Sequence, residues 1–290
     1  MTTTLHEPNE IVQQAVRSVT AIATLPEVTA RIVETVQDPR SSAAQLHKIV
    51  SHDPALVTRI LKVVNSAFYG LPGQIASIDR AIVLLGLNAI KNIAVAASLG
   101  QLFRGGKLCD GYVPRDLWKH CISVAVTGRE LARELKLPIA EEAFLAGMIH
   151  DIGLLVALQV WPDQLRQVCS RVQKGENDFC AVEQEVYGGV DHQQLGQAMA
   201  ELWKFPRACQ QVAGYHHRPE ALPAESRLLT AVVFVADTLC AAHDSGFPLT
   251  ARHQELATRD LEPLEIPPTV LERLSATLPE KIEAAAALIG

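Results

Sequence analysis

Seven side chains in one part of this sequence have the chemistry of metal ligands. They are five histidines and two aspartates, at His120, His150, His192, His216, His217, Asp151 and Asp237. Imidazole nitrogen and carboxylate oxygen suit Fe, Mn, Zn or Ni. Seven such groups are enough to hold one cation, or two cations about 3.5–4 Å apart. No cysteine belongs to the set, which argues against a structural zinc site of the thiolate type.

The pair His150–Asp151 is the most informative part of this set. It interrupts the otherwise apolar stretch LAGMIHDIGLL (145–155), which predicts a buried helix. Burying a carboxylate without a partner is expensive. Neighbours in a helix diverge by about 100°, so the two side chains can flank one cation or bridge two, but they hydrogen-bond each other poorly. Taken alone, the pair could also be a hydrogen-bonded core pair or could reach solvent at a helix edge.

His120 and Asp237 also interrupt apolar helical text, in LWKHCISVAV and VVFVADTLC. Each has an alternative explanation when taken alone, as a core histidine with a hydrogen-bond partner or as a buried carboxylate that caps a neighbouring element. The seven residues together favour a site for one or two metal ions. The remaining histidines stand in polar text and are expected to face solvent: His6, His47, His52, His243 and His253.

The elements that must position these residues are predicted to be helices. The chain has 290 residues, 48% of them hydrophobic and only 5% aromatic, a composition that favours packed helices. Apolar residues recur at helical spacing nearly throughout the chain. The part before residue 104 predicts about six helices. Helix starts are predicted at Ser41 or Ser42 and at Asp53–Pro54, with a break near Gly86.

The glycine-rich stretch RGGKLCDGYVP (104–114) predicts a linker. The expected organisation is an N-terminal helical bundle (1–108), a helical metal-binding domain (109–245) and a C-terminal helical tail (246–290). In the second region helices are expected over 114–136, 140–160, 162–174, 178–187, 191–204, 206–217 and 224–243. Two short helices are expected in the tail.

Charge and composition exclude several classes of function. The net charge is −6 and no Lys/Arg cluster is present, so direct nucleic-acid binding is not expected. The first ten residues are polar, and the apolar stretches are interpreted as too short or too interrupted to cross a bilayer. The six cysteines form no C-x-x-C pair and indicate reduced, mostly buried thiols of a cytoplasmic protein.

The order His120, His150–Asp151, Asp237 resembles the signature of the HD superfamily of metal-dependent phosphohydrolases. His192 and His216–His217 resemble the wider ligand set of the HD-GYP cyclic-di-nucleotide phosphodiesterases. The text as a whole is most similar to the HDOD (HD-related output domain) family over roughly residues 18–240. The similarity lies in these segments: LPEVTARIVETVQDP, HDPALVTRILKVVNSAFYG, IASIDRAIVLLGLNAIKNIAVAASL, LWKHCISVA, FLAGMIHDIGLLV, LGQAMAELWKFP and VAGYHHRP.

This resemblance implies an all-α fold, with an N-terminal helical bundle packed on an HD-type helical domain. It also implies a role in bacterial signal transduction and gene regulation, with protein partners. Three features depart from HD-GYP enzymes. Leu154 replaces the lysine after HDIG, the loop after His217 lacks Gly-Tyr-Pro, and Asp116 stands where some of these enzymes have a bridging glutamate.

Two functions remain open, together with a third possibility, that the cluster packs without metal. The first function is a cytoplasmic regulatory module whose metal site, with one or two Fe or Mn ions (or Zn or Ni), binds a nucleotide or phosphate ligand. The second is a metal-dependent phosphodiesterase or phosphohydrolase, with Asp151 as the metal-bridging and candidate catalytic ligand. Its candidate phosphate-binding cations are Lys119, Arg129 and Arg218. In the bundle, Phe68 and Tyr69 are either core anchors of a helix end or part of a partner surface.

Overall fold

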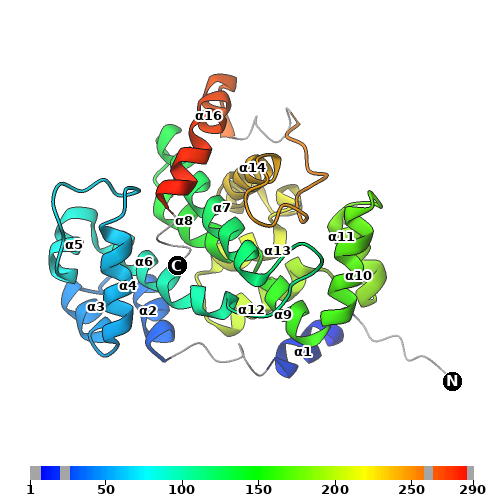
Figure 1. Cartoon of the computed structure of the whole chain (residues 1–290), viewed down its shortest axis with the longest axis horizontal. Helices are drawn as coiled ribbons and strands as arrows, with labels where there is room; N and C mark the ends of the chain where they lie inside the picture. The colour runs from blue at the N-terminus through cyan, green and yellow to red at the C-terminus, as the bar shows by residue number, and fades with distance from the viewer. Residues whose placement is uncertain (1–7, 20–26, 258–263, 286–290) are drawn as a thin grey trace.

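The structure is a computed structural model that describes residues 8–19, 27–257 and 264–285 (Figure 1). These residues form helices and no strand, which confirms the all-α prediction. The first part of the chain contains α1 (Pro8–Ser18), α2 (Glu27–Gln37), α3 (Ala43–Val50), α4 (Pro54–Val64), α5 (Ile78–Leu85), α6 (Leu87–Leu99) and the 3-10 helix η1 (Gly100–Phe103).

The rest of the chain supplies the second set of helices, among which lie those that carry the candidate ligands. They are α7 (Pro114–Glu134), α8 (Ala140–Ile149), α9 (Ile152–Val160), α10 (Pro162–Gln173), α11 (Phe179–Tyr187), α12 (His192–Leu202), α13 (Arg207–Tyr215), η2 (Pro219–Ala221), η3 (Ala224–Ser226), α14 (Leu228–Ala242) and α16 (Pro268–Ala284). In the tail, the described residues contain α16. Residues 258–263 and 286–290 lie outside the description, so the prediction of two tail helices is only partly covered.

The helix starts in the bundle follow the local sequence. Ser42 and Gln45 form a reciprocal capping box at the start of α3. Asp53 accepts a hydrogen bond from the backbone of Leu56, and Pro54 occupies the first turn of α4. These contacts satisfy backbone donors that have no partner inside the helix. Gly86, at φ +86°, separates α5 from α6, which confirms the predicted break.

Helices α2–α6 form the N-terminal bundle, to the left in Figure 1. Helix α6 is buried along nearly its whole length because it packs against α2, α4 and α5 within the bundle and against α8 outside it. The bundle is therefore fixed to the second half of the molecule through a largely apolar, buried helix, in which Asn92 also donates a hydrogen bond to the carbonyl of Glu141 in α8.

Helix α1 lies away from the bundle. It packs against α9 and α12, among the helices that follow residue 109 (Figure 1). The division of the chain at residue 108 stays a prediction, but the first helix of that segment contacts the second region.

Two helices, α8 and α9, replace the single helix expected over 140–160. The chain leaves helical geometry at Asp151, where φ is −96° and ψ is +17°. Periodicity could not reveal this break, because the residues on both sides of it are buried and apolar. The stretch Ala140–Val160 is long and apolar enough to cross a membrane, contrary to the expectation, but 83% of its most apolar window is buried against the rest of the protein.

Candidate metal centre

The structure brings all seven predicted residues together. They come from five separate places in the fold: His120 from α7, His150 and Asp151 from the turn between α8 and α9, His192 from the start of α12, His216 and His217 from the end of α13, and Asp237 from α14. Six of the seven are fully buried, and the side chain of His217 is 10% exposed. Their role as metal ligands stays a prediction.

A close backbone contact fixes the distance between two of these places. A β-carbon added at Gly153 would lie 1.9 Å from the carbonyl oxygen of His192. Only glycine allows α9 to approach the start of α12 so closely. Gly153 therefore determines how near His192 lies to the His150–Asp151 turn.

The Nδ1 atom of each of the five histidines faces an acceptor. His120 contacts the carbonyl of Ser245 at 3.2 Å, His150 that of Gly147 at 2.8 Å and His216 that of Val212 at 3.2 Å. His192 contacts Glu183 Oε2 at 2.5 Å, and His217 contacts Gln254 Oε1 at 2.7 Å. Each Nδ1 therefore carries the proton. In a neutral ring, this places the lone pair on Nε2, the arrangement that holds metal-ligating histidines in proteins.

The Nε2 atoms converge with the two carboxylates. His192 Nε2 lies 3.3 Å from that of His216 and 3.2 Å from that of His217. Asp151 Oδ1 is 3.3 Å from Nε2 of both His192 and His216. Asp151 Oδ2 lies 3.4 Å from His150 Nε2 and 3.9 Å from His120 Nε2. The two oxygens of Asp151 thus face two different groups of histidines.

Asp237 lies beside the group formed by His120 and His150. Its Oδ1 lies 3.0 Å from His120 Nε2 and 3.9 Å from His150 Nε2, and its Oδ2 lies 3.7 Å from His217 Nδ1. Three buried atoms of the cluster have no hydrogen-bond partner among the described residues: His150 Nε2, Asp151 Oδ1 and Asp237 Oδ2.

These spacings fit a bound cation. Two imidazole nitrogens that bind one ion at about 2.1 Å lie about 3.0 Å apart at a right angle and about 3.4 Å apart at the tetrahedral angle. The observed Nε2–Nε2 distances of 3.2 and 3.3 Å fall in this range. The three orphaned atoms also point to a cation, since buried polar atoms normally have partners.

The carboxylates are held ionised despite their burial. Burial opposes ionisation of Asp151, but the positive charge of His150 and the polar contacts with His192 and His216 outweigh it, so the pKa of Asp151 lies well below its usual value. The same balance, with His120 as the main partner, lowers the pKa of Asp237 to about 2. In return, Asp151 outweighs the effect of burial on His150 and raises its pKa to about 8.

The protonation of His192 differs from that of His216 and His217. Burial disfavours a charged His192, but the carboxylate of Glu183 outweighs this and raises the pKa of His192 well above its usual value. Burial lowers the pKa of His216, and lowers that of His217 much further. In the absence of metal, therefore, His192 carries a second ring proton, whereas His216 and His217 each keep a lone pair on Nε2.

The residues that support the ligands were not predicted from the sequence. Glu183 is fully buried and accepts hydrogen bonds from both Nδ1 and the backbone N–H of His192. A signal for it exists, because Glu183 lies on the buried stripe of α11 with Phe179, Val182 and Tyr187. A lone carboxylate in an apolar stripe needs a partner.

Among the described residues, none of the three predicted phosphate-binding cations forms an ion pair with Asp151 or Asp237. Arg129 is buried between the bundle and α8, where it pairs with Glu141 and lies over the rings of Phe68 and Tyr69. Phe68 and Tyr69 are accordingly anchors at this junction.

Arg218 lies 3.6 Å from Asp191 Oδ2, and Lys119 is exposed. Leu154 is fully buried, and Asp116 accepts a hydrogen bond from the backbone of Val113 instead of facing the histidines.

The other sequence expectations concern thiols and the remaining histidines. All six cysteines are free and five are buried. Four of the five other histidines are exposed, as expected, at positions 47, 52, 243 and 253. His6 lies outside the described residues.

A comparison with known families gives a clear result. The family model of the HDOD domain matches residues 22–219. The chain belongs to the HDOD family. This HDOD chain is also 24% identical, over 217 residues, to an uncharacterized protein of Treponema pallidum (strain Nichols). The match covers 74% of this chain and 41% of that protein, so the chain spans about two fifths of the length of its relative.

Solved structures share the fold of this HDOD chain. An HDOD domain protein of unknown function from Geobacter sulfurreducens has a TM-score of 0.82 at 23% identity, covering 97% of this chain and 98% of that one. A candidate signal transduction protein from Marinobacter aquaeolei VT8 has a TM-score of 0.79 at 20% identity, covering 100% and 67%. A candidate phosphohydrolase from Shewanella amazonensis SB2B has a TM-score of 0.76 at 23% identity, covering 96% and 98%. At these identities the likeness concerns the fold alone.

Proposed function

We propose that this HDOD chain is a cytoplasmic regulatory protein of bacterial signal transduction whose HD-type domain binds one or two divalent transition ions. Fe or Mn fits the nitrogen and oxygen donors best, with Zn or Ni as further candidates. Membership of the HDOD family supports this role, as does the name of the Marinobacter protein. The names of the Shewanella proteins, one of them a candidate metal-dependent phosphohydrolase, support a metal site.

The observation that carries the proposal is the uniform orientation of the five imidazoles. Every Nδ1 is committed to an acceptor, so the Nε2 atoms are left to face one another and two carboxylates. His120, His150, Asp151 and Asp237 would hold one ion. His192, His216 and His217 would hold the other, with Asp151 shared. A bound ion would supply positive charge for an anionic ligand such as a phosphate or a nucleotide.

A regulatory role agrees with what surrounds the ligands. The position that carries lysine in HD-GYP enzymes is the buried Leu154, and Arg129 and Arg218 are engaged with carboxylates elsewhere. Among the described residues, therefore, neither Arg129 nor Arg218 is positioned to bind a substrate phosphate.

Helix α7 supplies a path for a regulatory signal. It carries His120 in the metal centre and Arg129 beneath Phe68 and Tyr69 of the bundle. Nine residues of α-helix separate the two by about 13.5 Å. A rigid displacement of α7 on metal or ligand binding would therefore move the contact with the bundle. We expect protein partners to contact that bundle, and no direct binding to nucleic acid or membrane.

The proposal is tested by metal analysis of protein purified without oxygen. We expect one or two equivalents of Fe or Mn in the wild type and a loss of at least one equivalent in Asp151→Asn, which keeps the shape of the side chain. Asp163→Ala, at a side chain that is 87% exposed, is the matched control and should keep its metal. A wild-type protein that takes up no transition ion would refute the proposal.

A metal-dependent phosphodiesterase is the second candidate, favoured by the position of Asp151 between two histidine groups. Hydrolysis of bis(p-nitrophenyl) phosphate and of cyclic di-nucleotides, measured with added Mn²⁺ or Fe²⁺, separates the two functions. Turnover that disappears in Asp151→Asn would establish the enzyme. Stoichiometric metal without turnover would establish the regulatory module.

A further inference from the structure

One segment of the chain contacts the metal centre three times. Residues Ser245–Gln254, here called the strap, begin shortly after the end of α14 at Ala242. The Ser245 carbonyl accepts from His120 Nδ1, the Thr250 hydroxyl donates to Asp151 Oδ2 at 3.3 Å, and Gln254 Oε1 accepts from His217 Nδ1. The strap therefore touches both groups of ligands and the aspartate between them.

The strap has no regular secondary structure, so side-chain contacts hold it in place. Phe247 is fully buried and packs edge-on against Tyr112 and Phe179. Gln254 is oriented by its amide nitrogen, which donates to the carbonyl of Phe234 at 3.2 Å.

A glycine lets the strap lie directly on α7. Gly246 has a φ of +84°, and a β-carbon there would lie 2.4 Å from the carbonyl oxygen of Asp116 and 2.6 Å from the backbone nitrogen of His120. Both contacts are to backbone, which cannot rotate away. The close packing of the strap on α7 therefore requires a residue without a β-carbon at position 246.

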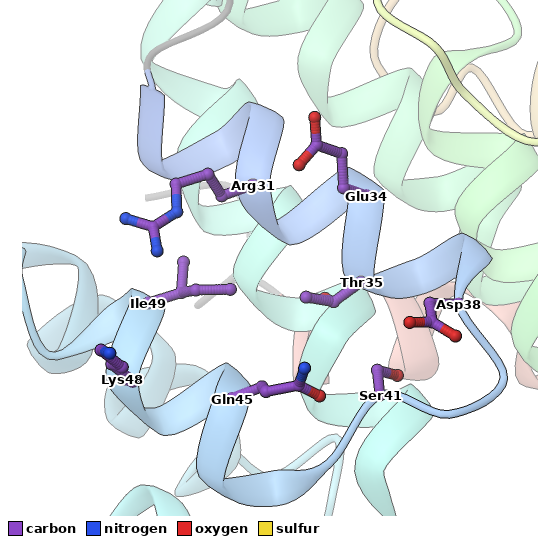
Figure 2. A pocket seen from close by; sticks show the side chains of 8 residues that line it. All are labelled: Arg31, Glu34, Thr35, Asp38, Ser41, Gln45, Lys48 and Ile49. Atoms are coloured by element: carbon purple, nitrogen blue, oxygen red, sulfur yellow. The ribbon is translucent and has the colours of Figure 1, made fainter.

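Three surface cavities formed by the described residues lie apart from the ligands. Their volumes are about 350, 340 and 380 Å³, and none of the three is lined by a residue of the cluster. The first lies between α2 and α3, in the bundle, as Figure 2 shows. The third is lined in part by Ser245 of the strap and by Lys119 of α7.

We propose that the strap is a cover that controls access to the metal centre and excludes phosphodiester ligands while it is closed. When it leaves, Asp151 Oδ2 loses the Thr250 hydroxyl and His217 loses Gln254, so one side of the ligand set opens to solvent. A small phosphate or nucleotide could then reach the ions. This inference rests on the proposed function only for the identity of what the strap covers, because the closure itself is a property of the chain.

The test uses Gly246→Ala, which pushes the strap off α7. Gly175→Ala is the matched control, because Gly175 has a φ of +85° but no heavy atom within 4 Å of an added β-carbon. Both variants carry the same backbone strain, and only one carries the clash. A double variant, Thr250→Val with Gln254→Leu, removes the hydrogen bonds of the strap with little change in volume and serves if Gly246→Ala fails to fold.

The first readout needs no metal. Metal-free protein is treated with diethyl pyrocarbonate, and modification of His120 and His216 is followed by mass spectrometry, with the exposed His52 as internal standard. We expect both buried histidines to react at least tenfold more slowly than His52 in the wild type and in Gly175→Ala. In Gly246→Ala or the double variant we expect their modification to accelerate at least tenfold.

The second readout is the rate at which a chelator removes Mn²⁺ from the loaded protein, which should rise in Gly246→Ala and stay unchanged in Gly175→Ala. Equal protection of His120 and His216 in all folded variants would refute the proposal that the strap is a cover. So would rapid modification of His120 and His216 in the wild type. A wild type that binds no metal would end the proposed function, while the modification rates would still decide whether the strap is a cover.

Discussion

Replacing Gly153 by alanine tests how the metal centre is positioned. The added β-carbon would lie 1.9 Å from the carbonyl oxygen of His192 and 2.7 Å from the backbone nitrogen of Gly196. Restoring ordinary van der Waals contact at about 3.4 Å requires α9 and α12 to separate by roughly 1.5 Å. Because His192 begins α12, this separation moves its imidazole away from Asp151.

The cost can be set by comparison with other insertions into packed interiors. Overpacking a core typically costs about 1–3 kcal/mol, and here both partners are backbone, so we expect a loss of about 3 kcal/mol or more. For a protein of this size, that corresponds to a fall in Tm of roughly 6–12 °C. Metal content should fall together with stability, because a shift of about 1.5 Å exceeds what a ligand at about 2.1 Å tolerates.

Gly128→Ala is the matched control. Gly128 lies inside α7, where an added β-carbon would meet its nearest neighbours at 3.7 Å, an ordinary contact. Alanine should be neutral there, or stabilising by about 0.4–1 kcal/mol, since it reduces the entropy of the unfolded chain. Urea unfolding and metal analysis of the two variants give the comparison. If Gly153→Ala is as stable as Gly128→Ala and keeps its metal, the close approach of α9 to α12 does not position the site.

Further predictions concern the supports of the site and the junction with the bundle. Glu183→Gln keeps an acceptor for His192 but removes its charge, and we expect metal affinity to fall about 10–100-fold in a chelator competition, against unchanged affinity if Glu183 only fills space. Arg129→Lys keeps the charge but loses the planar group that pairs with Glu141 between aromatic rings, so we expect a loss of about 1–3 kcal/mol in urea unfolding, and a neutral result would contradict this role. Because the pKa of His150 in the metal-free protein is about 8, an ion must displace a proton below that pH. Apparent metal affinity should therefore weaken as the pH falls from about 8, and an affinity independent of pH between 6 and 8 would show that His150 is not a ligand.

The elements of the fold were predictable where local chemistry decides them. The caps at Ser42 and Asp53 and the break at Gly86 follow from residue types that satisfy or interrupt a helix by themselves. The break at Asp151 was not predictable from periodicity, because apolar burial continues through it. The position of α1 depends on its contacts with α9 and α12, which lie far from it in the sequence. The amphipathic pattern of α1 predicts a buried face but does not indicate which helices cover it.

For the candidate site, residue type revealed the seven ligands but not their supports. Histidine and aspartate inside apolar helices stand out, because burial makes them costly. Thr250 and Gln254 do not stand out, since polar residues in an irregular tail normally face solvent. The strap was therefore divided from the domain that it covers by the boundary placed at residue 245. Only the folded chain shows that it lies against the ligands.

The electrostatics of the cluster argue against histidines that merely pack. His216 and His217 have lowered pKa values, so their Nε2 atoms are acceptors in the metal-free protein. His192, whose pKa is raised, has one Nε2 proton to offer to both of them and to Asp151, all within 3.3 Å. One proton cannot satisfy three acceptors, and Asp151 Oδ1 is indeed left without a hydrogen bond. A cation can accept all four lone pairs at once and also neutralise the ionised carboxylate. The same residues are therefore costly as a dry core and complementary to a metal ion.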